Sequence, residues 1–175
     1  MTKEYLREKY KKIRNNIKDK DIKSNIIKNK IVNTIEYKKS KVIALYKNLN
    51  SEVDTNELIN YALNDNKIVV LPKVKNNTLV FYKTDNKTFV KSNFNIYEPV
   101  ETDIVDNIDL FIVPGICFDK YKNRIGFGKG YYDRVLNSNS IKIGICFEEQ
   151  VYNDKIDVDQ YDVKMDKVIT DKNIY

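Results

Sequence analysis

The stretch Val42-Ile-Ala-Leu-Tyr46, followed by Asp54-Thr-Asn-Glu57 and then by Ile68-Val-Val-Leu-Pro72, decides the fold of this chain. The first and last of these pieces are continuous apolar runs of strand length, and the second run ends at Pro72. Residues 54–57 have the pattern of a capping box, which predicts a helix carrying Leu58, Ile59, Ala62 and Leu63. A strand, a helix and a strand in this order predict a right-handed parallel crossover, with helices covering the sheet.

Apolar spacing along the rest of the chain predicts the remaining elements. Two sets of residues at helical spacing predict two amphipathic helices over about the first 37 residues: Leu6, Tyr10, Ile13 and Ile17, and then Ile22, Ile26, Ile27, Ile31 and Ile35. Apolar runs predict further strands at residues 79–82, 89–90, 110–113, 141–147 and 168–170. We therefore expect an α/β fold in a single domain, residues 1–175, built as a three-layer sandwich with a mixed, largely parallel sheet flanked by helices.

The apolar segments and the cysteines exclude several classes of protein. The longest apolar run, residues 110–118, is interrupted by Pro114 and Gly115, and the basic N-terminus lacks the apolar core of a signal peptide. Cys117 and Cys146 lie in apolar runs without neighbours at metal-ligand spacing, which predicts buried, reduced thiols. We therefore expect a cytoplasmic protein that does not bind membranes.

The chain contains no histidine, and its formal net charge is +6. The first fact excludes Ser-His and Cys-His nucleophiles, so catalysis has to use carboxylates, lysine, arginine, tyrosine, backbone dipoles or a bound metal. The second favours an anionic partner. Part of the charge is expected to be a solvated face of the first helix, made of Lys9, Lys11, Lys12, Arg14, Lys18 and Lys20.

Three of the five glycines alternate within the stretch Arg124-Ile-Gly-Phe-Gly-Lys-Gly-Tyr-Tyr-Asp133. Alternating glycines allow positive φ angles and turn backbone N–H groups toward a common anion, and Arg124 and Lys129 add positive charge there. A helix expected from Tyr131 to about Asn137 would add its positive end. The spacing matches neither a P-loop nor a dinucleotide fingerprint. The glycines alone would fit a plain tight turn, but the cations and Asp133 favour a nucleotide-phosphate site.

This motif resembles the signature of the 5-formyltetrahydrofolate cyclo-ligase family. The resemblance begins at Val113-Pro-Gly-Ile-Cys-Phe-Asp119 and continues through residues 123–134. Three other parts of the chain resemble the family and occur in the family's order. They are Lys3-Glu-Tyr-Leu-Arg7, Ala44-Leu-Tyr46 with Ser51-Glu-Val-Asp-Thr55, and Asp162-Val-Lys-Met-Asp166. The resemblance covers nearly the whole chain, and the glycine motif is its specific part. Asn50-Ser51 stands where the family often has Pro-Gly, and Tyr161 where it often has histidine.

The resemblance implies an ATP-dependent conversion of 5-formyltetrahydrofolate to 5,10-methenyltetrahydrofolate, with release of ADP and phosphate. The formyl oxygen would be phosphorylated before the second folate nitrogen closes the ring. It implies catalytic roles for Arg124, Lys129 and Tyr131, and a Mg²⁺ ion held by Asp133 and Asp166. The residues expected to bind ATP are Lys3, Arg7, Arg124, Ile125, Gly126, Phe127, Gly128, Lys129, Gly130, Tyr131 and Tyr132. Those expected to bind the folate are Lys47, Glu52, Phe127, Gly128, Lys129, Gly130 and Tyr131.

The sequence also permits simpler structural roles and other functions for these residues. Asp133 also fits a carboxylate that stabilises the start of a helix, and Lys3 and Arg7 also fit ordinary exposed helix cations. Another nucleotide-dependent phosphotransferase, acting on a different small acceptor, is the alternative enzyme. A basic nucleic-acid-binding module is the alternative from another class, favoured by the charge and by thirteen tyrosines, but no RNA-binding signature accompanies them. We expect a monomer that acts on small molecules rather than on nucleic acid.

Overall fold

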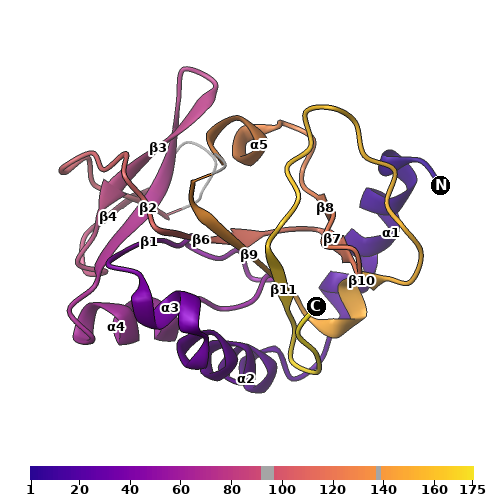
Figure 1. Ribbon diagram of the computed structural model, residues 1–175, viewed down its shortest axis with the longest axis horizontal. Helices are drawn as coiled ribbons and strands as arrows, with labels where there is room; N and C mark the ends of the chain where they lie inside the picture. The colour runs from indigo at the N-terminus through magenta and orange to yellow at the C-terminus, as the bar shows by residue number, and fades with distance from the viewer. Residues whose placement is uncertain (92–96, 137–138) are drawn as a thin grey trace.

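The computed structural model describes residues 1–91, 97–136 and 139–175, and its centre is a six-stranded sheet in the order β11-β9-β6-β1-β2-β3 (Figure 1). The strands are β1 (Val42–Ala44), β2 (Ile68–Lys75), β3 (Thr78–Lys83), β6 (Leu110–Pro114), β9 (Ile141–Ile145) and β11 (Lys167–Ile169). Every pairing in this sheet is parallel except that of β2 with the edge strand β3. The expected mixed, largely parallel sheet is therefore confirmed, as is the parallel pairing of β1 with β2 across helix α4 (Asn56–Asn64).

Alternation along the strands divides the core between the two faces of the sheet. Ile43 and Leu45 pack with α4 and with helices α2 (Lys20–Asn33) and α3 (Ile35–Lys39), which cover one face in Figure 1. Ala44 points to the other face, where the core includes Phe111 and Leu136, the residue that follows helix α5 (Tyr131–Val135). Successive side chains on a strand point to opposite faces, so one strand supplies both layers.

A second, smaller unit lies beside the main sheet and carries the N-terminal helix. Strands β10 (Val151–Tyr152), β7 (Cys117–Asp119) and β8 (Arg124–Ile125) form a three-stranded sheet, preceded at β10 by the 3₁₀ turn η1 (Glu148–Gln150). Helix α1 (Lys3–Asn16) packs its buried residues Leu6 and Tyr10 against this sheet. Figure 1 shows α1 next to β7, β8 and β10, so the N-terminus is held beside the segment that follows β8.

Two local expectations in the crossover are wrong. Strand β2 does not end at Pro72 but continues to Lys75. Its pairing with β1 reaches only Val70, so Pro72 is not required to donate a backbone hydrogen bond to β1 and is tolerated within the strand. The reciprocal capping box is not formed: Asp54 Oδ1 accepts from the Asn56 N–H at 2.8 Å instead of pairing with Glu57, and Thr55 makes no side-chain cap bond. The Thr55 hydroxyl donates to the Tyr46 carbonyl at 2.5 Å, which ties the start of α4 to the segment after β1.

The expected helix faces also need correction. Ile27 and Ile31 are buried in α2, but Ile22 and Ile26 are exposed. Ile22 precedes Ile27 by five residues and Ile26 precedes it by one, and neither spacing places a side chain on the same face of a helix. Ile35 is exposed at the start of α3. Several short strands were missed, namely β5 (Tyr97–Pro99), which pairs with β4 (Phe89–Lys91), and the three strands of the smaller sheet. Strand β7 lies at the end of the apolar run 110–118, beyond Pro114 and Gly115.

The chain contains no described helix with the length and apolarity that a bilayer-crossing segment requires. Helix α5 ends at Val135, and the expected end at Asn137 lies outside the described residues.

Candidate active site

The glycine-rich loop adopts the backbone conformation that its sequence predicts. Gly128 has a φ of 90° and Gly130 a φ of 64°, both in the left-handed region that glycine enters without strain. Gly130 is the residue before α5. The loop is held from α1, because Arg7 Nε donates to the Gly126 carbonyl oxygen at 3.0 Å. Arg7 is therefore a neighbour of the loop rather than a free helix cation.

A cavity of about 1060 Å³ lies over this loop. Leu49 and Pro114 reach it from the segments at the carboxyl ends of β1 and β6, which is where open α/β sheets gather ligands. The loop and α5 supply a second wall, α1 a third, and the segment before β11 a fourth. The lining residues are Lys3, Arg7, Leu49, Pro114, Arg124, Ile125, Gly126, Phe127, Gly128, Lys129, Gly130, Tyr131, Tyr132, Asp133, Arg134, Asp159, Tyr161 and Asp162.

Arg124 and Asp133 form an ion pair in the wall of the cavity. Arg124 Nη2 donates to both carboxylate oxygens of Asp133, at 3.2 and 3.1 Å. The backbone N–H of Val163 also donates to Asp133, at 3.2 Å. Asp133 thereby joins the glycine loop to the segment before β11, whatever else it binds.

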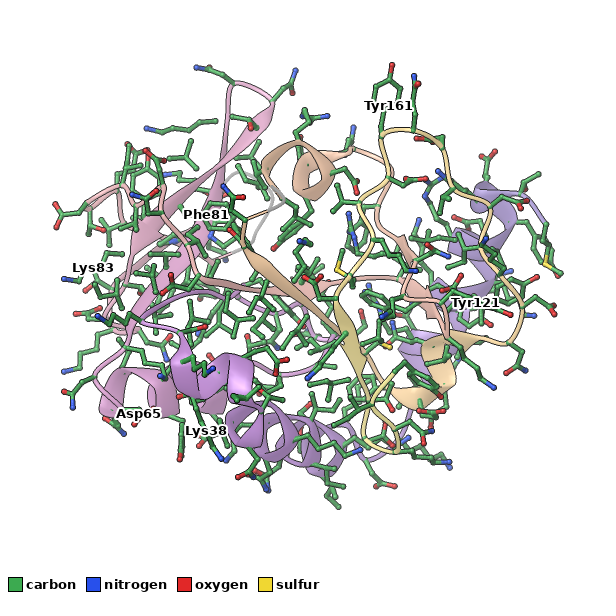
Figure 2. The ribbon with its side chains drawn as sticks, in the orientation of Figure 1. Lys38, Asp65, Phe81, Lys83, Tyr121 and Tyr161 are labelled. Carbon is green, nitrogen blue, oxygen red and sulfur yellow. The ribbon has the colours of Figure 1, made fainter. Side chains whose placement is uncertain are left out.

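Lys3 and Asp162 form a second ion pair across the same cavity, with Asp159 at 2.8 Å from Lys3 Nζ. Burial lowers the pKa of Lys3, but the hydrogen bonds to Asp159 and Asp162 outweigh it and leave the pKa raised. Lys3 is therefore a full positive charge at the mouth of the site. Tyr161, which lies in the same segment as Asp159 and Asp162, is strongly exposed, and Figure 2 shows it at the outer end of this segment before β11.

Asp166 is not brought to the cavity. Its carboxylate accepts a hydrogen bond of 2.7 Å from the Lys142 backbone N–H and lies 3.3 Å from Lys142 Nζ, near the amino end of β9. The carboxylates that share the cavity with Asp133 are Asp159 and Asp162, and Asp162 lies four residues before Asp166. Asp166 precedes β11 directly, so its side chain joins the two strands at their amino ends instead.

Glu52 lies behind Leu49 in a buried cluster rather than in the cavity wall. Its Oε2 accepts from the Leu49 N–H at 2.9 Å, and its Oε1 lies 3.4 Å from Arg14 Nη1. Burial raises the pKa of Glu52, and the Leu49 N–H and Arg14 act in the opposite direction. Lys47 is also outside the cavity, bonded to Asn56 and stacked 4.5 Å above the Phe89 ring.

Sequence reasoning assigned Arg14 to the solvated face of the first helix, which is wrong. Only 4% of Arg14 is exposed, and its guanidinium lies 5.4 Å from the centre of the Phe127 ring. The signal was present in the sequence, since Arg14 follows Arg7 by seven residues and so falls on the same face of the helix. Pro114, Arg134, Asp159 and Tyr161 also line the cavity without having been predicted as site residues.

The aromatic and cationic residues of the loop differ in their surroundings. Lys129 is exposed and lines the cavity, and Tyr131 lies 5.3 Å under the Arg134 guanidinium. Tyr132 lies against Arg124, and burial, followed by the negative charge of Glu52, raises its pKa. Tyr132 therefore stays a neutral phenol, located between the glycine loop and the Glu52 cluster.

Comparison with known proteins gives one consistent result. The model of the 5-formyltetrahydrofolate cyclo-ligase family matches residues 1–171. The chain is 34% identical to a probable 5-formyltetrahydrofolate cyclo-ligase of Schizosaccharomyces pombe, over 88% of this chain and 86% of that protein. Among solved structures, it superposes on a 5,10-methenyltetrahydrofolate synthetase of Aquifex aeolicus with a TM-score of 0.87 and 34% identity, covering 99% of this chain and 92% of the other. A synthetase from Mycoplasma pneumoniae gives a TM-score of 0.79 at 28% identity, covering 98% of this chain and 99% of the other.

Proposed function

Because the chain belongs to the 5-formyltetrahydrofolate cyclo-ligase family, we propose that it converts 5-formyltetrahydrofolate to 5,10-methenyltetrahydrofolate, using ATP and releasing ADP and phosphate. The observation that carries the proposal is the cavity of about 1060 Å³ in which the glycine loop, Lys3 and Arg7 meet. The loop and helix α1, which carries both Lys3 and Arg7, come from distant positions in the sequence, and each is cationic or presents backbone N–H groups. They suit a nucleoside triphosphate.

The chemistry requires activation of a poor electrophile. A formamide carbon is unreactive and its oxygen leaves badly, so transfer of the γ-phosphoryl group to the formyl oxygen makes both steps feasible. The second folate nitrogen then attacks the activated carbon, and the C–O bond breaks with release of phosphate. Such transfer depends mainly on positioning and charge neutralisation, which a site without histidine can supply.

The cations of the cavity are assigned to the phosphates. Lys129 is the exposed cation at the centre of the loop, and Arg124 lies in the wall beside it. With the loop N–H groups they neutralise charge on the moving phosphoryl group, while Tyr131 contacts the reacting end of the substrate. Lys3 and Arg7 hold the nucleotide from α1. The remaining loop residues, Ile125 to Gly130 together with Tyr132, shape the walls for both substrates.

The folate ring is assigned to the side of the cavity near Leu49. The Glu52 carboxylate lies directly behind that residue and accepts its N–H. A pterin presents adjacent N–H donors that one carboxylate can accept together. Binding in this way requires the ring to replace Leu49 as a donor to Glu52. Lys47 follows the same strand, β1, two residues before Leu49, and is assigned to the outer part of the folate.

A magnesium ion fits the oxygen donors of this cavity. Asp133 and Asp162 are carboxylates, and Mg²⁺ prefers one or two carboxylates together with phosphate oxygens. In the structure Asp133 is paired with Arg124 and Asp162 with Lys3, and a bound phosphate would also attract these two cations. We therefore assign the metal to Asp133 and Asp162, in place of the expected pair Asp133 and Asp166. When bound, the ion neutralises charge on the phosphates.

The wider setting follows from the charges and thiols. Cys117 and Cys146 are free and buried, which suits a reducing cytoplasm. We place the protein there as a monomeric, single-domain enzyme. Lys3, Arg7 and Lys129 line the cavity, so an anionic small molecule accounts for them without a nucleic acid or a membrane.

Purified protein incubated with ATP, Mg²⁺ and 5-formyltetrahydrofolate tests the proposal. We expect the absorbance of the methenyl product and one ADP for each product formed. ADP release without the chromophore would identify a phosphotransferase with another acceptor. Folded protein that produces neither would refute the assignment, and salt-sensitive binding to oligonucleotides would then favour the nucleic-acid alternative.

A further inference from the structure

Arg14 occupies a position that the proposed chemistry has not used. Its side chain is 5% exposed, and its Nη1 lies 3.4 Å from Glu52 Oε1. The guanidinium also lies 5.4 Å from the centre of the Phe127 ring, in the glycine loop. One buried cation on α1 thus contacts both the carboxylate that lies behind Leu49 and an aromatic ring of the glycine loop.

This pair is not explained by stability alone. Two buried charges lose their hydration, and replacing such a pair with apolar residues is often neutral or stabilising. The Nε atom of Arg14 is buried and has no hydrogen-bond partner among the described residues. A buried guanidinium with an unused donor lowers stability, so a purely structural contact does not account for it. The positive charge is accounted for if Arg14 has to keep a carboxylate charged.

We infer that Arg14 is a positioning residue for the folate: it keeps Glu52 ionised and aimed at the pterin, and it fixes Phe127 of the glycine loop relative to that carboxylate. This inference rests on the proposed function. Arg14 does not line the cavity, so its effect on the substrate is transmitted through the two residues that it contacts.

The groups around Glu52 show why a cation is needed. The segment after β1 contributes Tyr46, helix α5 contributes Tyr132, and both phenols have raised pKa values through burial and, after it, the charge of Glu52. They stay neutral at physiological pH. Arg124 faces Tyr132 from the loop and is paired with Asp133. Among the described residues, Arg14 is the cation at ion-pair distance from Glu52.

The sign of the pH effect follows from this arrangement. Burial already raises the pKa of Glu52, and Arg14 opposes that rise. Without the Arg14 charge the pKa moves further upward, so Glu52 becomes protonated nearer to neutral pH. A protonated carboxyl group accepts two pterin N–H bonds poorly. The KM for folate should therefore increase as pH falls, and this increase should begin at a higher pH in the variant than in the wild type.

Steady-state kinetics of Arg14→Gln, Glu52→Gln and the double variant between pH 6 and 9 test the inference. We expect Arg14→Gln to raise the KM for folate roughly ten- to a hundredfold, as for loss of a charged hydrogen bond, with a KM for ATP close to wild type. Its folate KM should fall as pH rises. In the Glu52→Gln background the same substitution should add little, and the pH dependence should be absent.

Lys11→Gln is the matched control, because Lys11 lies on the same helix, keeps 39% of its side chain exposed and pairs with Glu8. It should leave both KM values and the pH profile unchanged. Arg14→Lys keeps the charge and should retain the wild-type pH profile with a KM only a few times higher. If Arg14→Gln does not fold, Arg14→Lys in the two backgrounds decides: an effect that disappears with Glu52→Gln supports the inference, and an undiminished effect overturns it.

Other outcomes separate this inference from the proposed function. A wild type that turns over folate, with an Arg14→Gln variant whose KM and pH profile match it, overturns the role of Arg14 and leaves the function intact. Equal, additive losses for Arg14→Gln and Glu52→Gln also overturn it. A wild type with no methenyl product refutes the function, and the Arg14 inference fails with it.

Discussion

At the scale of single residues, the carboxylates of the cavity are paired with cations that have a second potential partner. Asp133 binds Arg124 and Asp162 binds Lys3, and all four side chains line the cavity. Under the proposed function, ATP would offer phosphate to the cations and Mg²⁺ would offer a cation to the carboxylates. The charges that neutralise one another in the free protein would then be those that the two proposed ligands need, and exchange of partners would leave none of the four side chains without an opposite charge.

Substitution of the three candidate carboxylates distinguishes a metal ligand from a structural one. Asp133→Asn and Asp162→Asn should each raise the Mg²⁺ concentration required for half-maximal activity, and excess metal should partly restore the rate, because an amide is a weaker ligand than a carboxylate. Asp166→Asn is the matched control: it removes the pair with Lys142 and should lower stability by about 1 kcal/mol without changing the metal requirement. Activity titrated against Mg²⁺, with melting temperatures alongside, checks this. An unchanged metal requirement in Asp133→Asn would leave Asp133 as the partner of Arg124 alone.

Lys129 provides a separate test of phosphoryl transfer. If its charge is neutralised by the phosphoryl group mainly in the transition state, Lys129→Met should reduce kcat by about a hundredfold or more while the Kd for ATP changes only a few-fold. Lys120→Met, at an exposed position outside the cavity, is the control. Turnover and calorimetric ATP binding give the two quantities. A parallel loss of both would indicate that Lys129 only binds the nucleotide.

At the scale of elements, the sequence predicted those parts of the fold that depend on local patterns. The apolar runs gave β1, β6 and β9, and the alternating glycines gave the loop with positive φ at Gly128 and Gly130. What it could not give depends on the tertiary fold. The short strands β7, β8 and β10 exist because they pair with one another, and Arg14 is buried because α1 packs beside them. The location of Asp166 depends on β9, which lies more than twenty residues away in sequence.

The contact between the two sheets has a testable consequence at Gly144 in β9. A Cβ atom there would lie 2.3 Å from Phe118 Cε1, and one at Gly115 would lie 2.4 Å from Cε2 of the same ring. Gly144→Ala should therefore lower the free energy of unfolding by about 1–3 kcal/mol or more, because the ring has to move in a close-packed core. In a Phe118→Leu background the same change should cost less. Urea unfolding of the four proteins measures this coupling, and strictly additive losses would contradict the packing account.

At the scale of the whole molecule, the cavity exists only when the chain is fully folded. Lys3 in α1 meets Asp159 and Asp162 near the other end of the sequence, and the glycine loop lies between them. Carboxylates also fasten the last strand and the C-terminus. Glu148 accepts hydrogen bonds from Thr170, from Asn173 at 2.9 Å and from Tyr175 at 2.7 Å. Glu148 thus holds the residues that follow β11, whereas the segment before β11 is held at the cavity by its bonds to Asp133 and Lys3.

The same anchoring predicts how the fold responds to acid. Hydrogen bonding to Lys167 lowers the pKa of Glu36. For Glu148 and Glu149 burial raises the pKa, but hydrogen bonds outweigh it and leave the pKa below the ordinary value of 4.5. A carboxyl group with a lowered pKa stabilises the fold above its unfolded pKa, and that contribution is lost as pH falls through the folded value. The free energy of unfolding should therefore be level near neutral pH and fall below about pH 4.5. Glu52, whose pKa is raised, acts in the opposite direction but is one group against three.

Glu148→Gln tests this account directly. At pH 7 it should lower the free energy of unfolding by about 1–3 kcal/mol, because an amide replaces a charged acceptor of three hydrogen bonds. Below pH 4.5 the difference from the wild type should shrink, because the carboxyl group is protonated first in the unfolded chain and then, as pH falls through its lowered pKa, in the folded protein. Glu8→Gln, at an exposed position of α1, makes the same charge change and should alter stability little at either pH. Urea unfolding at pH 7 and pH 4 measures all three proteins. A Glu148→Gln loss of the same size at both pH values would show that the glutamate stabilises the C-terminus by its shape rather than by its charge.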